Sequence, residues 1–419
     1  MLMGIYIIGT NIVLPGINPT LIDQGEGAGG ILGLINTFSG GAFNQQSIFA
    51  LGIMPYISAS IFMQLMTVLV PSFQKMQKEG ESGRKKINQY TRYLTVLVTI
   101  FQASAYVSYI ISMNKGNGAM IASYSSYFWL SSLLILTAGT LFVMWMGEKI
   151  TDKGLGNGTS LIIMVGILNR LPQSFIQELS AKSNRTGDIL IFIIEIAILI
   201  VIILACILLI QGVRKIPVNY AKQIVGNNKF GGARQFLPIK VNSAGVMPII
   251  FAQAIMFLPT LFTLGQDGAN SLGQMFTDHS NFWYMLIYSV VVIGFTFLYT
   301  ALIFNPKQIS DNLKQNNGFI PGVKPGQPTT DYIGAIMDKI TLPGAIFLAL
   351  IGILPGIAQR FGVSQGFATF FGGTSLLIMV GVILDTLQQI ETQLMMRQYD
   401  GLMKSGRIQG RQTTSAVGY

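Results

Sequence analysis

The sequence predicts an all-α polytopic membrane protein, with ten transmembrane helices in two inverted halves of five. Three observations lead to this fold class. The chain of 419 residues is 51% hydrophobic and only 11% charged, whereas a soluble domain carries about 25% charged residues. Its apolar residues form ten runs separated by polar, Gly or Pro residues. A motif at the start of the second run also recurs in the seventh.

Most of the runs are as long as a membrane-spanning helix, which needs roughly 20 residues. The first run is the exception, because its 14 residues are too few to cross a hydrocarbon core of about 30 Å. We therefore expect either that residues are missing upstream of Met1 or that the first helix is incomplete. The ten runs lie at 1–14, 47–70, 91–112, 125–146, 158–176, 188–211, 243–264, 282–304, 342–361 and 367–387.

Basic residues assign the two sides of the membrane, since Lys and Arg collect in cytoplasmic connections. The connections after even-numbered runs, together with the tail, hold 22 of the 27 Lys and Arg residues. Both termini are therefore expected in the cytoplasm. The basic residues of the opposite side are Lys115, Arg170, Lys182, Arg185 and Arg360.

A repeated motif relates the second run to the seventh. Residues 52–64 and 245–257 match at six of thirteen positions, and each copy has a helix-breaking Pro at its fourth position. The two runs are five spans apart, an odd number, so their helices cross the membrane in opposite directions. This relation is typical of inverted repeats, which place their pathway between the halves. The alternative is chance similarity between two apolar helices.

The predicted topology divides the chain into two halves and a tail. The N-terminal half is 1–187 and the C-terminal half is 188–390, followed by a cytoplasmic tail at 391–419. The C-terminal half contains two cytoplasmic loops, 212–242 and 305–341, which are too long for simple connectors. Their Pro and Gly residues favour stiff turns that hold a hairpin away from the membrane. Their basic residues suit anionic lipid headgroups or RNA phosphate equally well, and their length favours a large partner.

The outer connection between the first two runs is unusually small and apolar. Its central segment, 28–46, is rich in Gly and is too short to span the membrane. Two interpretations remain open: an interfacial loop, or a re-entrant segment that folds back into a protein-lined cavity. Such a cavity is the setting in which non-helical backbone is tolerated at membrane depth.

The sequence argues against an enzyme and against an ion-coupled transporter. Coupled transport needs ionisable groups near the midplane, but Glu195 and Asp385 lie near the ends of their runs, where we expect solvation or pairing. His279, the single histidine, falls in an outer loop, so no catalytic triad and no metal site can be assembled. The alternating glycines of 154–158 precede an apolar helix without a βαβ unit and are interpreted as a turn, not a nucleotide site. No cofactor is expected, and Cys206 is interpreted as inert packing.

Seven separate stretches of the chain are informative together: 12–17, 49–60, 78–84, 147–158, 237–242, 319–322 and 371–378. In this order they resemble the SecY family, the central subunit of the protein-conducting channel. The resemblance covers nearly the whole chain.

The resemblance implies an hourglass-shaped pore between the two halves, closed at its waist by aliphatic side chains. Segment 28–46 would then be a plug on the outer side of that waist. By motif position, the ring residues are Ile53, Ile57, Ile163, Ile250 and Ile378.

The resemblance also implies a lateral gate between spans 2 and 7, through which apolar segments pass into lipid. The prolines Pro55 and Pro248 belong to these helices, and Gln64 and Asn242 are candidates to tune the opening of the gate. The two cytoplasmic loops would bind the ribosome or the SecA motor ATPase. The docking candidates are Arg234, Lys240, Lys307 and Lys324.

Other implied partners are the small membrane subunits SecE and SecG, nascent signal-sequence polypeptides and membrane lipids. The implied location is the cell inner (plasma) membrane.

The sequence departs from the family at three places. Lys324 replaces a usual Arg and lacks its bidentate fork, Thr159 replaces a common Ile near the ring, and 231–236 differs from the usual polar run.

The sequence therefore predicts a passive, gated channel for unfolded polypeptide, driven by a partner. The main alternative is an inverted-repeat secondary transporter for a small solute, which requires a polar midplane site. A third interpretation is a non-conducting membrane scaffold, which predicts tolerance of polar residues at the ring.

Overall fold

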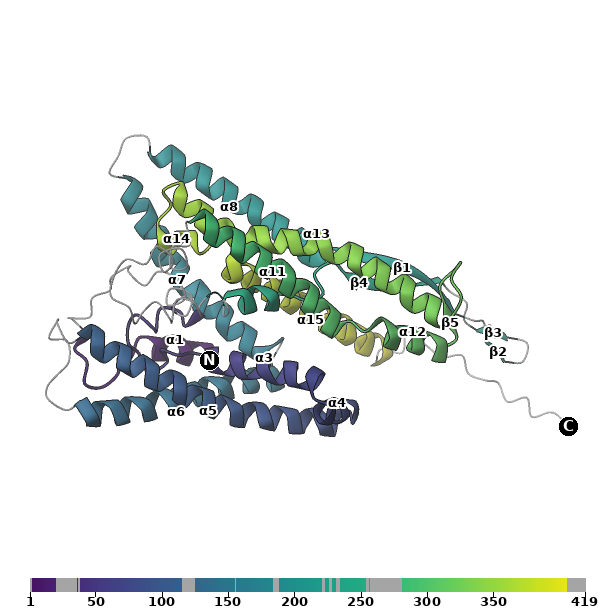
Figure 1. Ribbon diagram of the computed structural model, residues 1–419, viewed down its shortest axis with the longest axis horizontal. Helices are drawn as coiled ribbons and strands as arrows, with labels where there is room; N and C mark the ends of the chain where they lie inside the picture. Colours follow the sequence, from purple (N-terminus) through teal and green to yellow (C-terminus); the bar gives the residue numbers. More distant parts are fainter. Residues whose placement is uncertain are drawn as a thin grey trace.

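The computed structural model of the chain is mostly helical (Figure 1). It describes residues 2–19, 36, 38–114, 125–154, 156–183, 188–220, 223–225, 228–230, 234–253, 256 and 281–404.

The helices follow the apolar runs in chain order. Residues 247–253 are also helical, at the start of the seventh run. The helices are α1 Leu2–Thr10, α3 Met54–Leu69, α4 Pro71–Lys78, α5 Glu81–Asn114, α6 Ser125–Lys153, α7 Gly158–Ser183, α8 Asp188–Gln211, α11 Phe282–Ile303, α12 Pro306–Gln315, α13 Gln327–Arg360, α14 Gln365–Ala368 and α15 Gly373–Lys404.

Within the described residues, seven helices are long and apolar enough to cross a membrane. The pair α3 and α4 provides an eighth candidate, bent by 100°. The bend has a local cause, because Val70 precedes Pro71 and adopts an extended conformation (φ −104°, ψ 118°) that ends α3. The nine-residue α1 is too short to span, in line with the short first run. The membrane-protein fold class is confirmed, while the count of ten spans stays a prediction.

Three helices extend well beyond their apolar runs on the side assigned to the cytoplasm. The helix α5 begins at Glu81 rather than near residue 91, and α13 begins at Gln327 rather than near 342. The helix α15 continues to Lys404, past the end of its run at 387. Hydropathy marks where a helix enters the hydrocarbon, whereas a helix of good helix formers continues into water. The run boundaries therefore differ from the helix boundaries at these three ends.

The two long loops that were predicted to be cytoplasmic form one unit, which we name the cytoplasmic module. Strand β1 (Val213–Tyr220) pairs antiparallel with β4 (Arg234–Lys240) and, on its other edge, with β5 (Gly318–Phe319) of the second loop. A short hairpin of β2 (Gln223–Val225) and β3 (Asn228–Phe230) belongs to the first loop. The shared core of the module consists of Ile216, Val218, Ile239, Leu313, Ile320, Ile333 and Met337.

The membrane helices form two sets that lie one above the other in Figure 1. Helices α1 to α6 pack among themselves, while α8, α11, α13 and α15 make up the other set. Helix α7 runs from the first set towards α14 and α8, and it packs against α15 and α14. A core cluster that includes Ile163 of α7 and Phe371 joins the two sets. Helix α7 therefore contacts helices of both sets and connects them.

Candidate functional site

The two copies of the repeated motif begin their helices in the same way. Gly52 and Gly245 both have positive φ, +53° and +64°, a backbone conformation that favours glycine. Three residues later, Pro55 and Pro248 are each the second residue of a helix and are buried. Proline is well tolerated there, because the amide hydrogen it lacks would have no partner within the helix. The shared motif thus produces the same turn-and-helix geometry twice.

Three of the five predicted ring residues lie in one apolar cluster, and a fourth packs against it. Ile53, Ile163 and Ile378 are buried members, and the partly buried Ile57 is the fourth residue. Ile53 directly precedes α3 and Ile57 lies on it, while the other two belong to α7 and α15, so the cluster lies where the two sets meet.

The fifth predicted ring residue is placed differently. Ile250 is half-buried and is not part of that cluster. Its neighbour Ile249 is fully buried in the core of the second set. Val246, one turn earlier, packs against both clusters and links the seventh run to the ring helices.

The described end of the predicted plug packs inside the protein. Residues 38–46 include buried side chains, and the structure satisfies their backbone internally: the Phe43 amide donates to Ser39 Oγ (3.2 Å). The Tyr106 hydroxyl of α5 donates to the Phe43 carbonyl (2.6 Å). Residues 38–46 are therefore held by contacts within the protein, as a re-entrant segment would be. Residues 28–35 and 37 lie outside the described residues.

The plug segment approaches α7 through two glycines. A Cβ on Gly40 would lie 3.1 Å from the Gly166 Cα, and a Cβ on Gly166 would lie 2.9 Å from the Phe38 carbonyl oxygen. Asn169 Nδ2, on the same helix, donates to the Gly40 carbonyl (3.4 Å). The segment is therefore seated on the helix that carries Ile163.

A polar contact joins α3 to α11, two helices of different sets. The Tyr299 hydroxyl donates to Gln64 Oε1 at 2.6 Å. Phe251, in the helical stretch 247–253, packs on Tyr299 with ring centroids 5.9 Å apart. Sequence reasoning selected Gln64 but missed Tyr299, because no motif connects positions 235 residues apart.

Asn242 is not part of that contact. It lies two residues after the end of β4, where the cytoplasmic module meets the membrane helices, and its Oδ1 is buried without a hydrogen-bond partner in the described residues. The two polar residues selected from the sequence therefore lie in different surroundings.

A buried ionic group joins α7 to α8 at their shared outer end. Lys182 Nζ lies 3.1 Å from Glu178 Oε1 and also contacts the Glu195 carboxylate of α8. The Ser364 amide donates to the second Glu178 oxygen (3.0 Å). Glu195 was expected to be paired or solvated, and it is paired.

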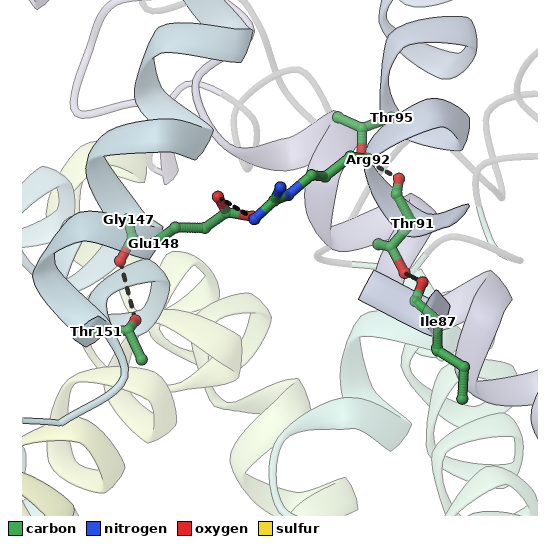
Figure 2. A network of polar contacts seen from close by, with 7 residues as sticks. All are labelled: Ile87, Thr91, Arg92, Thr95, Gly147, Glu148 and Thr151. Atoms are coloured by element: carbon green, nitrogen blue, oxygen red, sulfur yellow. Dashed lines mark hydrogen bonds and ion pairs between the residues drawn. The ribbon is translucent and has the colours of Figure 1, made fainter. Parts of the chain in front are cut away.

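A second polar network joins α5 to α6 close to the start of α7 (Figure 2). Arg92 on α5 donates two hydrogen bonds to the Glu148 carboxylate on α6, at 2.8 and 2.9 Å. Thr151 donates to the Gly147 carbonyl (2.9 Å) and accepts from the amide of Gly158, the first residue of α7 (2.8 Å). The glycine-rich stretch 154–158 therefore leads from the end of α6 into the membrane helix α7, as expected for a turn, and these contacts fix the start of the helix that carries Ile163.

The predicted docking residues lie on the cytoplasmic module. Lys240, Lys307 and Lys324 are exposed, and Arg234 begins β4 opposite Asn219. Asn305 caps α12 by accepting from the Gln308 amide (3.3 Å), which orients the first turn containing Lys307. Among the residues that the structure describes, no group of three or more His, Cys, Asp and Glu could hold a metal ion.

The family model for SecY matches residues 47–387. The chain is 41% identical over 421 residues to "Protein translocase subunit SecY" of Mycobacterium tuberculosis (strain ATCC 25618 / H37Rv), covering 96% of this chain and 94% of that one. A match of this length, at this identity, decides the family. The chain belongs to the SecY family.

Other SecY relatives agree. The protein translocase subunit SecY of Corynebacterium glutamicum is 41% identical over 422 residues, and that of Streptomyces coelicolor is 39% identical over 414 residues. Each alignment covers 96% of this chain and 94% of the relative.

Solved structures share the SecY fold. One described as the structure of a protein conducting channel has a TM-score of 0.63 at 15% identity, covering 93% of this chain and 90% of that one. A Sec61 structure in a canine ribosome-channel complex from the endoplasmic reticulum has a TM-score of 0.59 at 15% identity, with the same coverage of 93% and 90%. These likenesses confirm a multi-pass membrane protein with the channel fold.

One departure from the SecY pattern has a local explanation. Thr159 lies in the first turn of α7, one turn before Ile163, and its hydroxyl donates to Asn157 Oδ1 (2.6 Å). The same Asn157 oxygen accepts from the Thr159 amide (3.1 Å). The Thr therefore serves the N-terminus of the helix, which an Ile could not do by hydrogen bonding.

Proposed function

We propose that this SecY-family chain forms a passive, gated channel for unfolded polypeptide, with a ring of Ile53, Ile57, Ile163, Ile250 and Ile378 at its waist. As a family member it is a protein translocase subunit. The observation that carries the proposal is the one apolar cluster that contains Ile53, directly before α3, Ile163 of α7 and Ile378 of α15.

An aliphatic ring suits a channel that must stay closed to ions while accepting many sequences. A narrow apolar constriction excludes water and ions by dewetting. It offers no fixed charge or hydrogen bond that would retain a particular passing segment. The plug segment seated on α7 would close the same passage from the outer side.

The lateral gate would lie between α3 and the helix that begins at Pro248. Support comes from the matched starts of the two helices, with Gly52 and Gly245 in the same backbone conformation. Together with the odd number of spans between them, this geometry supports two inverted halves, 1–187 and 188–390. Gln64, on α3, would tune the opening, and Asn242 would do so from the base of the module.

The chain would supply the pathway and not the energy. We infer that it is not an enzyme and takes no cofactor, and that SecA or a translating ribosome drives transport from the cytoplasmic module through Arg234, Lys240, Lys307 and Lys324. The Sec61 neighbour is described in a ribosome-channel complex. SecE, SecG and lipids would surround the helices in the inner membrane, with both termini in the cytoplasm.

Replacing Ile57, Ile163 and Ile250 together with Asn tests the channel. We expect the variant to leak ions through reconstituted bilayers in the absence of substrate, because a polar ring no longer dewets. The matched control is Ile176→Asn, a lipid-facing residue of α7 that is 63% exposed.

Unchanged conductance in a folded ring variant would contradict the channel and would favour the scaffold interpretation. The transporter alternative is not supported by the family match, and it predicts saturable uptake of a small solute by the wild-type protein. The same reconstituted vesicles can measure both outcomes.

A further inference from the structure

The two sets of helices are joined unequally on their two sides. On one side α7 packs against α14 and α15, and the buried group of Glu178, Lys182 and Glu195 ties α7 to α8. On the other side α3 packs mainly on α5 and α4 of its own set. Among the described residues, the side-chain hydrogen bond that joins the two sets on this side is the one from Tyr299 of α11 to Gln64 of α3.

Aromatic neighbours hold the Tyr299 side chain in place. It is 5% exposed, on α11, and its ring is held by Phe251 of the seventh run. Phe251 in turn stacks on Phe295, one turn earlier on α11, with centroids 5.7 Å apart. The aromatic packing fixes where the Tyr299 hydroxyl points, so the partner that it finds on α3 is Gln64.

We propose that the hydrogen bond between Tyr299 and Gln64, which we name the seam clasp, sets how apolar a segment must be to leave the pore. The exit in question is the seam between α3 and the helical stretch 247–253. The inference rests on the proposed lateral gate and adds a specificity-determining residue on a third helix, α11. A passing segment must break this hydrogen bond, and only its own partitioning into lipid compensates. The threshold for release therefore rises with the strength of the clasp.

The size of the effect follows from hydrogen bonds measured between membrane helices. One such bond changes a two-state ratio by about threefold to twentyfold. In a leucine–alanine test segment, the same change corresponds to about one to four leucines. The clasp is thus strong enough to bias release and weak enough to be opened by a signal sequence.

The experiment measures membrane integration of a graded leucine–alanine series by the full chain in its native complex. Tyr299→Phe removes only the hydroxyl, and it should lower the threshold by about one to four leucines. Gln64→Leu should do the same, and the double variant should lie no further from wild type than either single one. Thr296→Val is the matched control, because it removes a buried hydroxyl on α11 that bonds within its own helix (Val292 carbonyl, 2.7 Å).

Three results would overturn the clasp: an unchanged threshold in Tyr299→Phe, additive effects in the double variant, or an equal shift in Thr296→Val. Strongly apolar segments should integrate equally in all variants, which separates a changed threshold from a misfolded protein. Failure of the lateral gate itself is distinguishable, since the wild-type chain would then integrate no segment of the series.

Discussion

The acidic and basic residues between α7 and α8 show how membrane helices can hold such side chains without forming a transport site. Glu178, Lys182 and Glu195 are 1%, 9% and 6% exposed, and they neutralise one another in part. Their position between α7 and α8 makes them a structural joint. Buried charges are tolerated when they are paired and hydrogen-bonded.

Lys182→Met should destabilise the folded protein by about 3–5 kcal/mol, because it leaves two carboxylates buried without their cation. The loss is measured as a lower midpoint of thermal unfolding in detergent. Lys85→Met is the matched control, since Lys85 pairs with Glu81 at the surface (76% and 84% exposed) and such pairs contribute little. Equal midpoints for the two variants would contradict a structural joint.

At the scale of the elements, the sequence predicted the course of the chain better than its contacts. Composition and charge placed the membrane spans, since both follow from the solvent around each residue. They could not show that α5 starts at Glu81, because a helix passes from water into lipid without a break in its hydrogen bonds. They also treated the two cytoplasmic loops as separate hairpins, whereas β5 completes the sheet begun by β1.

The candidate site was predictable only where the family motif fixes a position. Three ring residues, Ile53, Ile163 and Ile378, share one cluster, whereas Ile250 lies outside it and stays a prediction of the family motif alone. Tyr299 had no sequence signal, since its role depends on a side chain 235 residues away.

The cytoplasmic module should bind its large partner through exposed lysines. Lys240→Glu, Lys307→Glu and Lys324→Glu together should weaken ribosome binding and flatten its salt dependence, by about one unit of slope for each RNA phosphate that the variant no longer neutralises. Lys339→Glu, also exposed but on the α13 stem, is the control. If the lysines face lipid, the variant should instead lose affinity for anionic vesicles while its ribosome binding stays at the wild-type level.

At the scale of the whole molecule, two contacts lie on different sides of the helix sets. One is the seam between α3 and the stretch 247–253, and the other is the ionic group between α7 and α8. Opening would separate α3 from the stretch 247–253 while α7 stays attached to α8, α14 and α15. A polypeptide segment that leaves the pore into the lipid would therefore contact α3 and the stretch 247–253, and not α8.

Site-specific crosslinking to a stalled secretory chain checks this geometry. A photoreactive residue at Ser58 on α3 or at Phe251 should give adducts, while one at Ile194 on the lipid-facing side of α8 should not. Absence of adducts at both seam positions would remove the lateral gate, and adducts at Ile194 would place the exit elsewhere.

The shared core of the cytoplasmic module has a mechanical consequence. Ile333 and Met337 of that core belong to α13, a helix of 34 residues that continues through the membrane and is about 50 Å long. A partner that binds either loop is therefore attached to one end of this helix, which contains Pro343 and Pro355. Because α13 packs against α11, a displacement of α13 would be felt at Tyr299 on α11, so binding of the partner and opening of the gate would be coupled.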